Sequence, residues 1–317
     1  VIRDECQMSQ LSERLGEIFP AVYAAVAAQG GRFSGHLDVF SHFAPQYLGV
    51  GVLALILAFV LESGRDRTLL AVFGGVAVLG SLALITPELM RPPAPRAPAD
   101  APDQLKLIQF NVAEMNTDLE PALDWLAAQD PDVLVTQESS PAFRRAVQAR
   151  MGRHMTCGMT CGVAIFSRAA PVRVEKPRRG YYGLGPAIAV VHFAGDGREF
   201  AVVGLHYVWP TEVRTHKENS RRMIQVLKGR PRDRLVVAGD FNSTPWSFAR
   251  RRDDAALGIE RRTRALFSWP ARGLPGLAVL PIDHIYAGPD WRTVSVDRGP
   301  RLGSDHYPVV AILAPTR

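Results

Sequence analysis

Residues 234–245 read RLVVAGDFNSTP, a stretch that passes from an apolar run directly into a cluster of polar groups. The valine-rich run predicts a buried strand over residues 234–241, because it is too short for a typical helix. Asp240 and Asn242 stand at its end, where an apolar residue would bury better and an unpaired polar group is costly. The pattern therefore indicates a carboxylate and an amide placed at a strand end for chemistry rather than for packing.

The same feature recurs along the second two thirds of the chain. Other predicted strands contain or follow a polar residue near one end: Asn111 in 105–112, Glu138 in 133–138, His206 in 200–208, Asp283 in 279–288, and Asp305 with His306 at the start of 306–313. One such residue is usually a cap or a satisfied core group. Six strand ends of this kind are difficult to explain as capping, and they predict one shared site.

The residue types at these strand ends suit one chemistry. Carboxylates and amides are hard oxygen ligands that Mg²⁺, Mn²⁺ or Ca²⁺ prefer, whereas zinc prefers softer ones. His206 and His306 can move protons or donate to phosphate oxygens, and Asp283 can orient a histidine from behind. In-line attack of water on a phosphate ester requires a cation, a carboxylate–histidine pair and amide donors. The pattern therefore predicts metal-dependent hydrolysis of a phosphate ester.

The elements between these strands predict an α/β protein. Helical periodicity at 118–129, 141–151 and 216–229 alternates with strands and gives way to consecutive strands, about nine in all. This order suggests two stacked sheets with helices outside them.

Five motifs in this order, LKLIQFNV, PDVLVTQES, GDFNSTP, IDHIYAG and SDHYPVV, resemble the endonuclease/exonuclease/phosphatase (DNase I-like) superfamily in its membrane-anchored bacterial form. The resemblance covers residues 104–317. It implies a four-layer sandwich of two mixed β-sheets flanked by helices, and hydrolysis of a phosphodiester or phosphomonoester with Mg²⁺ (or Mn²⁺) as cofactor. Each motif alone is short, whereas all five in order are specific.

The same resemblance implies that Asn111 and Glu138 hold the metal, with Glu138 as the principal ligand and Asp305 on the metal side. One departure concerns the leaving-group histidine, which a glutamate from an earlier strand supports in the DNase-like branch. Here the corresponding stretch, residues 180–190, contains no acidic residue. The short catalytic domain also leaves little room for loops that grip DNA. Both points disfavour a nuclease.

Five residues would carry the proton transfers and hold the phosphate, by the same resemblance. Asp240 would orient or deprotonate the attacking water, and Asn242 would bind the phosphate and fix Asp240. His306, paired with Asp283, would contact the phosphate or act as base. His206 would stand on the leaving-group side as acid or phosphate donor.

The first hundred residues have a different character. Residues 43–61 and 68–87 are uncharged, and at about 1.5 Å rise per residue each is long enough to span about 30 Å of hydrocarbon. They predict two transmembrane helices within 43–90, joined by the turn ESGRDR. The alternative is a pair of central helices in a large globular domain. Residues 1–42 form an N-terminal segment that could include a partial membrane helix.

Residues 91–103, RPPAPRAPADAPD, predict an extended linker before a catalytic domain at 104–317. The chain carries a formal net charge of +6, but residues 1–100 carry −2 and the remaining 217 residues carry +8. The two arginines of the ESGRDR turn favour a cytoplasmic turn, and hence a catalytic domain on the extracytoplasmic side of the cell membrane.

Two weaker signals have more than one interpretation. The stretch MGRHMTCGMTC at 151–161 could bind Cu(I) through its soft side chains, or Cys157 and Cys161 could be loop thiols or a local disulfide in an oxidising compartment. Basic runs such as 221–234 could bind nucleic-acid phosphates or anionic lipid headgroups, or could be solvated helix faces.

Three hypotheses for function follow. The first is a membrane-anchored phosphoesterase that uses the lipid bilayer as partner and acts on a membrane-associated, lipid-linked phosphate ester, because tethering raises the effective concentration of such substrates. The second is a membrane-tethered DNase- or RNase-type nuclease, which the +8 charge of the second part and His206 favour. The third is a degenerate domain used as a scaffold, which the complete set of polar positions disfavours.

Overall fold

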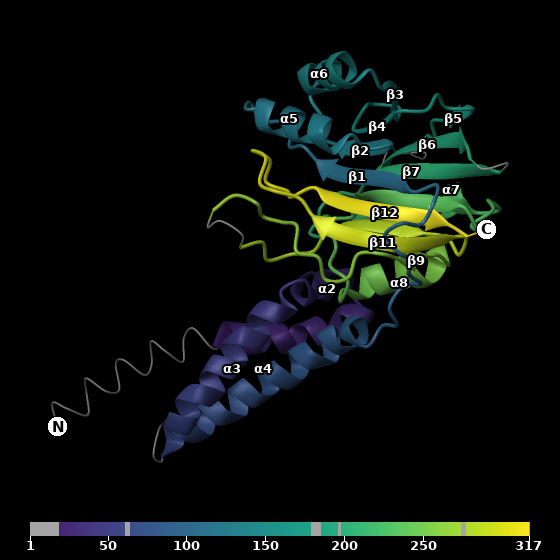
Figure 1. The fold of residues 1–317 in the computed structure, drawn as a ribbon. Helices are drawn as coiled ribbons and strands as arrows, with labels where there is room; N and C mark the ends of the chain where they lie inside the picture. The colour runs from purple at the N-terminus through teal and green to yellow at the C-terminus, as the bar shows by residue number, and fades with distance from the viewer. Residues whose placement is uncertain (1–18, 61–63, 179–184, 196–197, 274–276, 317) are drawn as a thin grey trace. The chain divides into compact units, whose positions relative to one another are not determined.

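The structure is a computed structural model that describes residues 19–60, 64–178, 185–195, 198–273 and 277–316. The chain divides into two compact units, Val1–Arg91 with Trp246–Arg251 and Pro92–Pro245 with Arg252–Arg317. Within the described residues, the first unit is helical and the second contains all the strands (Figure 1).

The first sheet of the second unit has the strand order β11-β12-β1-β2-β4-β3 within the described residues. The bounds are Trp291–Arg298 (β11), Val309–Pro315 (β12), Leu105–Asn111 (β1), Val133–Gln137 (β2), Val163–Ser167 (β4) and His154–Cys157 (β3). β1 and β2 are parallel, with Asn111 opposite Gln137, whereas the neighbouring pairs are antiparallel. The carboxyl ends of β1 and β2 therefore reach the same edge of the sheet.

The second sheet has the order β5-β6-β7-β8-β10-β9. The bounds are Arg173–Glu175 (β5), Ala187–Ala194 (β6), Glu199–His206 (β7), Leu235–Asp240 (β8), Asp283–Ala287 (β10) and Glu260–Arg261 (β9). β7 and β8 are parallel, and β10 is antiparallel to β8. The sheet is therefore mixed, like the first, and the carboxyl ends of β7 and β8 meet the start of β10.

The two sheets face each other across an apolar core, and helices cover their outer faces (Figure 1). Side chains such as Val135 and Ile285 meet between the sheets. Outside the first sheet lie α5 (Glu120–Gln129) and α6 (Pro141–Met151), and outside the second lies α7 (Val213–Leu227), each with an apolar face against its sheet. This arrangement confirms the predicted four-layer α/β sandwich.

The structure adds elements that the sequence pattern did not predict. β3, β5 and β9 are short edge strands with the polar sequences HMTC, RVE and ER. Edge strands bury few side chains, so their sequences lack the usual apolar alternation. The strand predicted at 279–288 begins only at Asp283, because Leu280 N instead donates to Trp269 O at 2.8 Å.

The linker at 91–103 is extended, and part of it pairs with the first sheet. Ala97 N donates to Thr293 O (3.0 Å), and Thr293 N donates to Pro95 O (2.8 Å). This short parallel bridge fixes the middle of the linker to β11.

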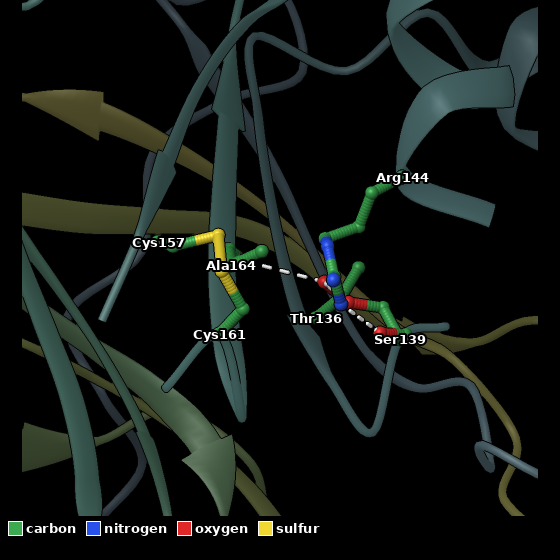
Figure 2. Close-up of a disulfide and its surroundings, with 6 residues drawn as sticks. All are labelled: Thr136, Ser139, Arg144, Cys157, Cys161 and Ala164. Carbon is green, nitrogen blue, oxygen red and sulfur yellow. Dashed lines mark hydrogen bonds between the residues drawn. A yellow bond between two sulfur atoms is a disulfide. The ribbon is translucent and has the colours of Figure 1, made fainter. Parts of the chain in front are cut away.

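Cys157 and Cys161 form a disulfide that closes the loop between β3 and β4. Figure 2 shows the bond beside Ala164 of β4. On the other side of Ala164, the Thr136 hydroxyl donates to the Ala164 carbonyl oxygen (3.3 Å) and ties β2 to β4. The disulfide is therefore the interpretation of 151–161 that the structure supports, and it removes both thiols as ligands for Cu(I).

The first unit contains a series of helices. Residues 19–29 are helical, followed by η1 (Gly30–Arg32), α2 (Gly35–Ser41), α3 (Ala44–Val60) and α4 (Arg65–Leu89). Among the described residues α4 is long and apolar enough to cross a membrane, and α2 with α3, bent by 57°, passes the same criterion as a pair. α4 begins at Arg65, so the end of the predicted turn is helical.

Small residues form the contact between α3 and α4. Gly51 and Gly74 approach so closely that a Cβ on either would lie 2.9 Å from the carbonyl oxygen of the other. Ala54 and Ala77 are fully buried, whereas Phe59 is 86% exposed. Small residues at the contact with large apolar residues facing outward are typical of helices packed in a bilayer.

The segment 246–251, which starts α8 (Phe248–Leu257), belongs to the first unit. Asp38 of α2 accepts hydrogen bonds from the backbone N of Phe248 (2.8 Å) and of Ala249 (2.7 Å). A carboxylate that accepts the free amides of a first helical turn stabilises that helix. Ser247 adds a local cap, because its Oγ accepts from Arg250 N (3.1 Å), whereas the cap from Asp38 comes from a distant part of the chain and could not be predicted from the local sequence.

Candidate active site

Strand ends from both sheets bring five of the predicted polar residues to one edge of the sandwich. Asn111 ends β1 and Glu138 follows β2, while His206 and Asp240 end β7 and β8. In the second sheet His206 lies opposite Asp240, and Asp240 lies opposite Asp283 at the start of β10.

A hydrogen-bonded amide stands at the centre of this edge. Nδ2 of Asn111 donates to Oε1 of Glu138 (3.2 Å) and to Oδ2 of Asp240 (3.1 Å). Nε2 of His206 lies 3.6 Å from the same two oxygens. Oδ1 of Asn111 accepts from Ala113 N (3.1 Å), which fixes the orientation of the amide. Two carboxylates and an imidazole therefore face one common space.

His306 is held between two buried carboxylates. Its Nδ1 lies 2.9 Å from Oδ2 of Asp283, and its Nε2 lies 3.7 Å from Oδ2 of Asp240. Burial alone would lower the pKa of His306, but the charges of Asp283 and Asp240 outweigh burial and raise this pKa to about 9. His306 is therefore an imidazolium near neutral pH, able to donate a hydrogen bond from Nε2.

The Asp240 carboxyl group resists ionisation. Burial raises its pKa to about 7, and the charge of His306 opposes this rise while that of Asp283 adds to it. Oδ1 of Asp240 accepts from Asn242 N (2.8 Å), and Oδ2 lies 3.4 Å from Nδ2 of Asn242. A carboxylate whose pKa lies near the working pH is well suited to accept a proton.

Two residues of the site have an unusual backbone conformation. Glu138 has φ = 50° and Asn242 has φ = 47°, in the left-handed region that residues with side chains rarely adopt. Such strain costs about 1–3 kcal/mol and is concentrated at functional sites. It projects Glu138 out of the sheet end, where 42% of its side chain is exposed.

The surroundings of Glu138 fit a divalent cation. Glu138 offers carboxylate oxygens of the kind that Mg²⁺ or Mn²⁺ binds and is open to solvent, whereas Asn111 turns Nδ2 towards Glu138 and its Oδ1 accepts from Ala113 N, so its role as a ligand stays a prediction. Oδ1 of Asn242 is buried and has no donor among the described residues. An orphaned acceptor of this kind is satisfied when water or another ligand enters the site.

Asp240, Asp283 and His306 form a second group that could hold an ion. Each offers one ligand atom, these atoms lie within 4.8 Å of one another, and all three residues are buried. The bond between His306 and Asp283 already occupies Nδ1 and Oδ2. The described residues thus offer two places for a cation, this buried triad and the more exposed Glu138.

Asp305 contacts the loop that precedes β10. Its Oδ2 accepts from Nε1 of Trp269 (3.2 Å), and its carbonyl oxygen accepts from Ala271 N (2.7 Å). Its charge also helps to raise the pKa of the neighbouring His306. Among the described residues, the side-chain partner of Asp305 is therefore an indole, and its role on the metal side stays a prediction.

Gln109, which the sequence pattern did not single out, supports the site from behind. It is buried within β1, and its Nε2 donates to Oε1 of Gln137 (2.9 Å) and to Oδ1 of Asp283 (2.8 Å). Nε2 of Gln137 donates in turn to the Leu205 carbonyl oxygen (3.3 Å). The Leu205 carbonyl oxygen can only accept, so the direction of donation in this chain of hydrogen bonds is fixed. Because Gln109 uses Oδ1 of Asp283, the other carboxylate oxygen, Oδ2, can accept from His306. The available signal was a glutamine inside an apolar strand.

Replacing this amide tests the relay. We expect Gln109→Met, which conserves side-chain length, to lower kcat by about 10–100-fold, the usual effect of losing a partner behind a functional histidine. KM should change less, because Gln109 does not contact substrate. Steady-state kinetics at saturating metal measure both constants, with Gln148→Met on the exposed face of α6 as the control. A kcat equal to that of the wild type would show that the relay does not position His306.

Solved structures share this architecture. A mannosyl-6-phosphatase from Bacteroides thetaiotaomicron has a TM-score of 0.54 at 17% identity, over 66% of this chain and 99% of that chain. Sphingomyelinase C from Streptomyces griseocarneus has a TM-score of 0.52 at 20% identity, over 67% and 99%. D. rerio TDP2 in complex with a single-strand DNA product has a TM-score of 0.52 at 17% identity, over 66% and 98%. No curated protein matches the chain.

Fold and site together define a phosphoric ester hydrolase of the class that depends on a divalent metal. The family model described as Endonuclease/Exonuclease/phosphatase matches residues 108–306, more than half of the chain. The chain therefore belongs to this family, which confirms the resemblance of its five motifs to the superfamily, while the membrane-anchored form stays a prediction. Members of the family act as phosphoesterases or nucleases.

Proposed function

We propose that the protein is a membrane-anchored phosphoesterase that hydrolyses a membrane-associated phosphate ester by in-line attack of water. The observation that carries the proposal is the contact of Asn111 with both Glu138 and Asp240, beside His306, which lies between Asp283 and Asp240. A metal-binding carboxylate, a proton acceptor and a cationic donor within one site are what this reaction needs.

Each residue of the site would have a distinct role in this reaction. Asn111 and Glu138 would hold a divalent ion, which when bound supplies positive charge to the phosphate. Asp240 accepts a proton from water as the new bond between oxygen and phosphorus forms. His306 donates a hydrogen bond to a phosphate oxygen, and Asp283 keeps its imidazole charged and oriented. His206, 3.6 Å from Asp240, protonates the oxygen that leaves as the ester bond breaks.

Two features support a membrane substrate. α4 is long and apolar enough to cross a bilayer, and its contact with α3 through small residues suits a lipid environment. The disulfide between Cys157 and Cys161 favours an oxidising compartment, in agreement with a catalytic domain on the extracytoplasmic side. A tethered domain meets membrane-borne esters at high effective concentration.

A membrane-tethered nuclease is the second candidate. The +8 charge of residues 101–317 favours contact with a phosphate backbone, and the fold is shared with a structure that holds a DNA product. The acidic residue expected behind the leaving-group histidine in such enzymes is absent from 180–190. Of this stretch, residues 180–184 lie outside the described residues.

A panel of esters separates the two candidates. The full chain in detergent, stripped with EDTA and reloaded with Mg²⁺ or Mn²⁺, is offered plasmid DNA, bis-p-nitrophenyl phosphate and vesicles that contain phosphatidic acid or a polyprenyl phosphate. We expect metal-dependent hydrolysis of a lipid phosphate with a kcat/KM at least about 10-fold above that for DNA cleavage. Rapid plasmid cleavage without lipid hydrolysis would reverse the ranking, and failure on every ester would contradict the proposal.

A further inference from the structure

Large apolar side chains are exposed at a few places on the second unit, and most of these places are on loops. Within the described residues the set is Met115 (84% exposed), Met159 (58%), Val172 (56%), Val174 (41%), Trp209 (42%) and Leu277 (56%). The two valines lie on or beside the edge strand β5. The other four, Met115, Met159, Trp209 and Leu277, lie on four different loops, and we call them the apolar rim.

All four loops of the apolar rim are at the active-site edge of the sandwich. Met115 follows the end of β1, Trp209 follows the end of β7, and Leu277 precedes the start of β10. Met159 precedes β4, whose first residue is opposite Gln137, immediately before Glu138. Four independent loops thus place an exposed apolar side chain at one edge of the sandwich.

The rim is in contact with the functional site. Trp209 packs edge-on against Trp269, with ring centroids 5.3 Å apart. Nε1 of Trp269 donates to Asp305, the residue before His306. A group that covers Trp209 therefore lies beside Trp269, which contacts the residue that precedes His306.

The charges around the rim indicate what covers it. Exposed charges of both signs lie close to the rim: Glu114 is beside Met115, Glu212 and Arg214 follow Trp209, and Arg301 donates to the Gly273 carbonyl oxygen in the loop before β10 (3.3 Å). A nucleic-acid surface would favour a uniformly basic rim. A zwitterionic lipid headgroup layer offers phosphates to the arginines and ammonium groups to the glutamates, and the acyl region below it accepts the apolar tips.

We propose that the apolar rim docks on the lipid bilayer, with Met115, Met159, Trp209 and Leu277 entering the boundary between headgroups and acyl chains. The active site would then open directly onto the lipid phosphates. α4 is an apolar helix able to hold the chain at a bilayer. In a chain tethered in this way, the rim meets the bilayer at a high effective concentration. The relevance of this docking to catalysis rests on the proposed function, whereas the experiment that tests the docking does not.

Quenching of tryptophan by brominated lipids measures this docking. The full chain is placed in phosphatidylcholine vesicles with or without brominated acyl chains, and the component due to Trp209 is obtained by comparison with Trp209→Phe. We expect bromolipid to remove about half or more of the Trp209 fluorescence, because interfacial side chains reach about 5–10 Å into the boundary region. The effect should persist in 0.5 M NaCl (about a 4 Å Debye length), since apolar contact is not screened.

Two further reporters in the Trp209→Phe background provide the matched comparison. Met115→Trp reports on the rim and should also be quenched. Val174→Trp reports on β5, where the native side chain is 41% exposed against 42% for Trp209, and should not be quenched.

Equal quenching at both positions, no quenching of Trp209, or quenching abolished by salt would overturn the proposal. Protection of Trp209 from acrylamide without bromolipid quenching would do the same and would indicate a protein partner. The measurement needs no substrate, so a failure here is distinguishable from failure to hydrolyse lipid phosphates.

Discussion

Asp240→Asn is expected to lower kcat by at least about 1000-fold while leaving the fold intact. Asparagine has the volume of aspartate and can still accept from Asn242 N, a bond of 2.8 Å in the native site. It cannot take a proton from water. The variant therefore keeps this bond and loses the base, although its Nδ2 replaces the Oδ2 that accepts from Asn111. Initial rates on bis-p-nitrophenyl phosphate at saturating Mg²⁺ measure the loss.

The same substitution should raise thermal stability. The pKa of Asp240 in the folded protein is raised to about 7, above its value of about 3.9 in an unfolded chain. The ionised carboxylate therefore costs free energy of folding above pH 7, and this cost disappears as the pH falls from about 7 to about 4. We expect Asp240→Asn to raise Tm at pH 8 in EDTA and to leave Tm unchanged at pH 4.

The control for both measurements is Asp297→Asn, at an exposed position of β11. It should alter neither kcat nor Tm. Turnover of Asp240→Asn within about 10-fold of the wild type would remove Asp240 from its role as base. A fall in Tm at pH 8 would instead mean that the charge of Asp240 stabilises the folded protein through His306.

The strands that carry the site could be predicted because their sequences contrast sharply. Asp240 follows a run of valines, and Glu138 follows VLVTQ, so each polar residue stands out against an apolar run. The pairing of β7 with β8 and of β8 with β10 then fixes where these residues meet. From the sequence, the pairing of these strands could be predicted only through the resemblance to a known family, because strand register depends on partners far along the chain.

The parts that the sequence missed depend on distant contacts. Gln109 looks like an isolated polar residue in a strand, and its meaning comes from Asp283, which is 174 residues away. α8 begins where Asp38 accepts its first amides, from 210 residues away. Trp269 lies in an irregular loop, where no periodicity exists to place it beside Asp305. Each is a tertiary interaction that local patterns do not encode.

The protonation states of Asp240 and His306 depend on each other. Asp240 with its pKa raised to about 7 and His306 with its pKa raised to about 9 hold opposite roles near neutral pH, the first accepting a proton and the second donating a hydrogen bond. Burial raises the pKa of Asp240, whereas the charges of Asp283 and Asp240 raise the pKa of His306 against the effect of burial. The close packing of the three side chains thus sets their protonation states.

His306→Gln and Asp283→Asn are expected to be non-additive. His306→Gln removes the cationic donor and should lower kcat by about 1000-fold or more. Asp283→Asn leaves the imidazole without the carboxylate that raises its pKa, and should cost about 100-fold or more, since Asp283 acts only through the 2.9 Å bond to Nδ1. The kcat of the double variant should then lie within about three-fold of the kcat of His306→Gln alone.

This comparison of the wild type, the two single variants and the double variant distinguishes a positioning role of Asp283 from binding of the metal by Asp283. If Asp283 held the cation itself, its loss would weaken activation by Mg²⁺ even when His306 is already absent, and the two losses would multiply. Metal titrations of kcat in all four proteins measure this directly, and circular dichroism confirms that each variant is folded. An apparent Kd for Mg²⁺ that is unchanged in Asp283→Asn, together with the non-additive kcat, would exclude Asp283 as a ligand and agree with a cation at Asn111 and Glu138. Multiplicative losses with weakened Mg²⁺ activation would move it to the buried triad of Asp240, Asp283 and His306.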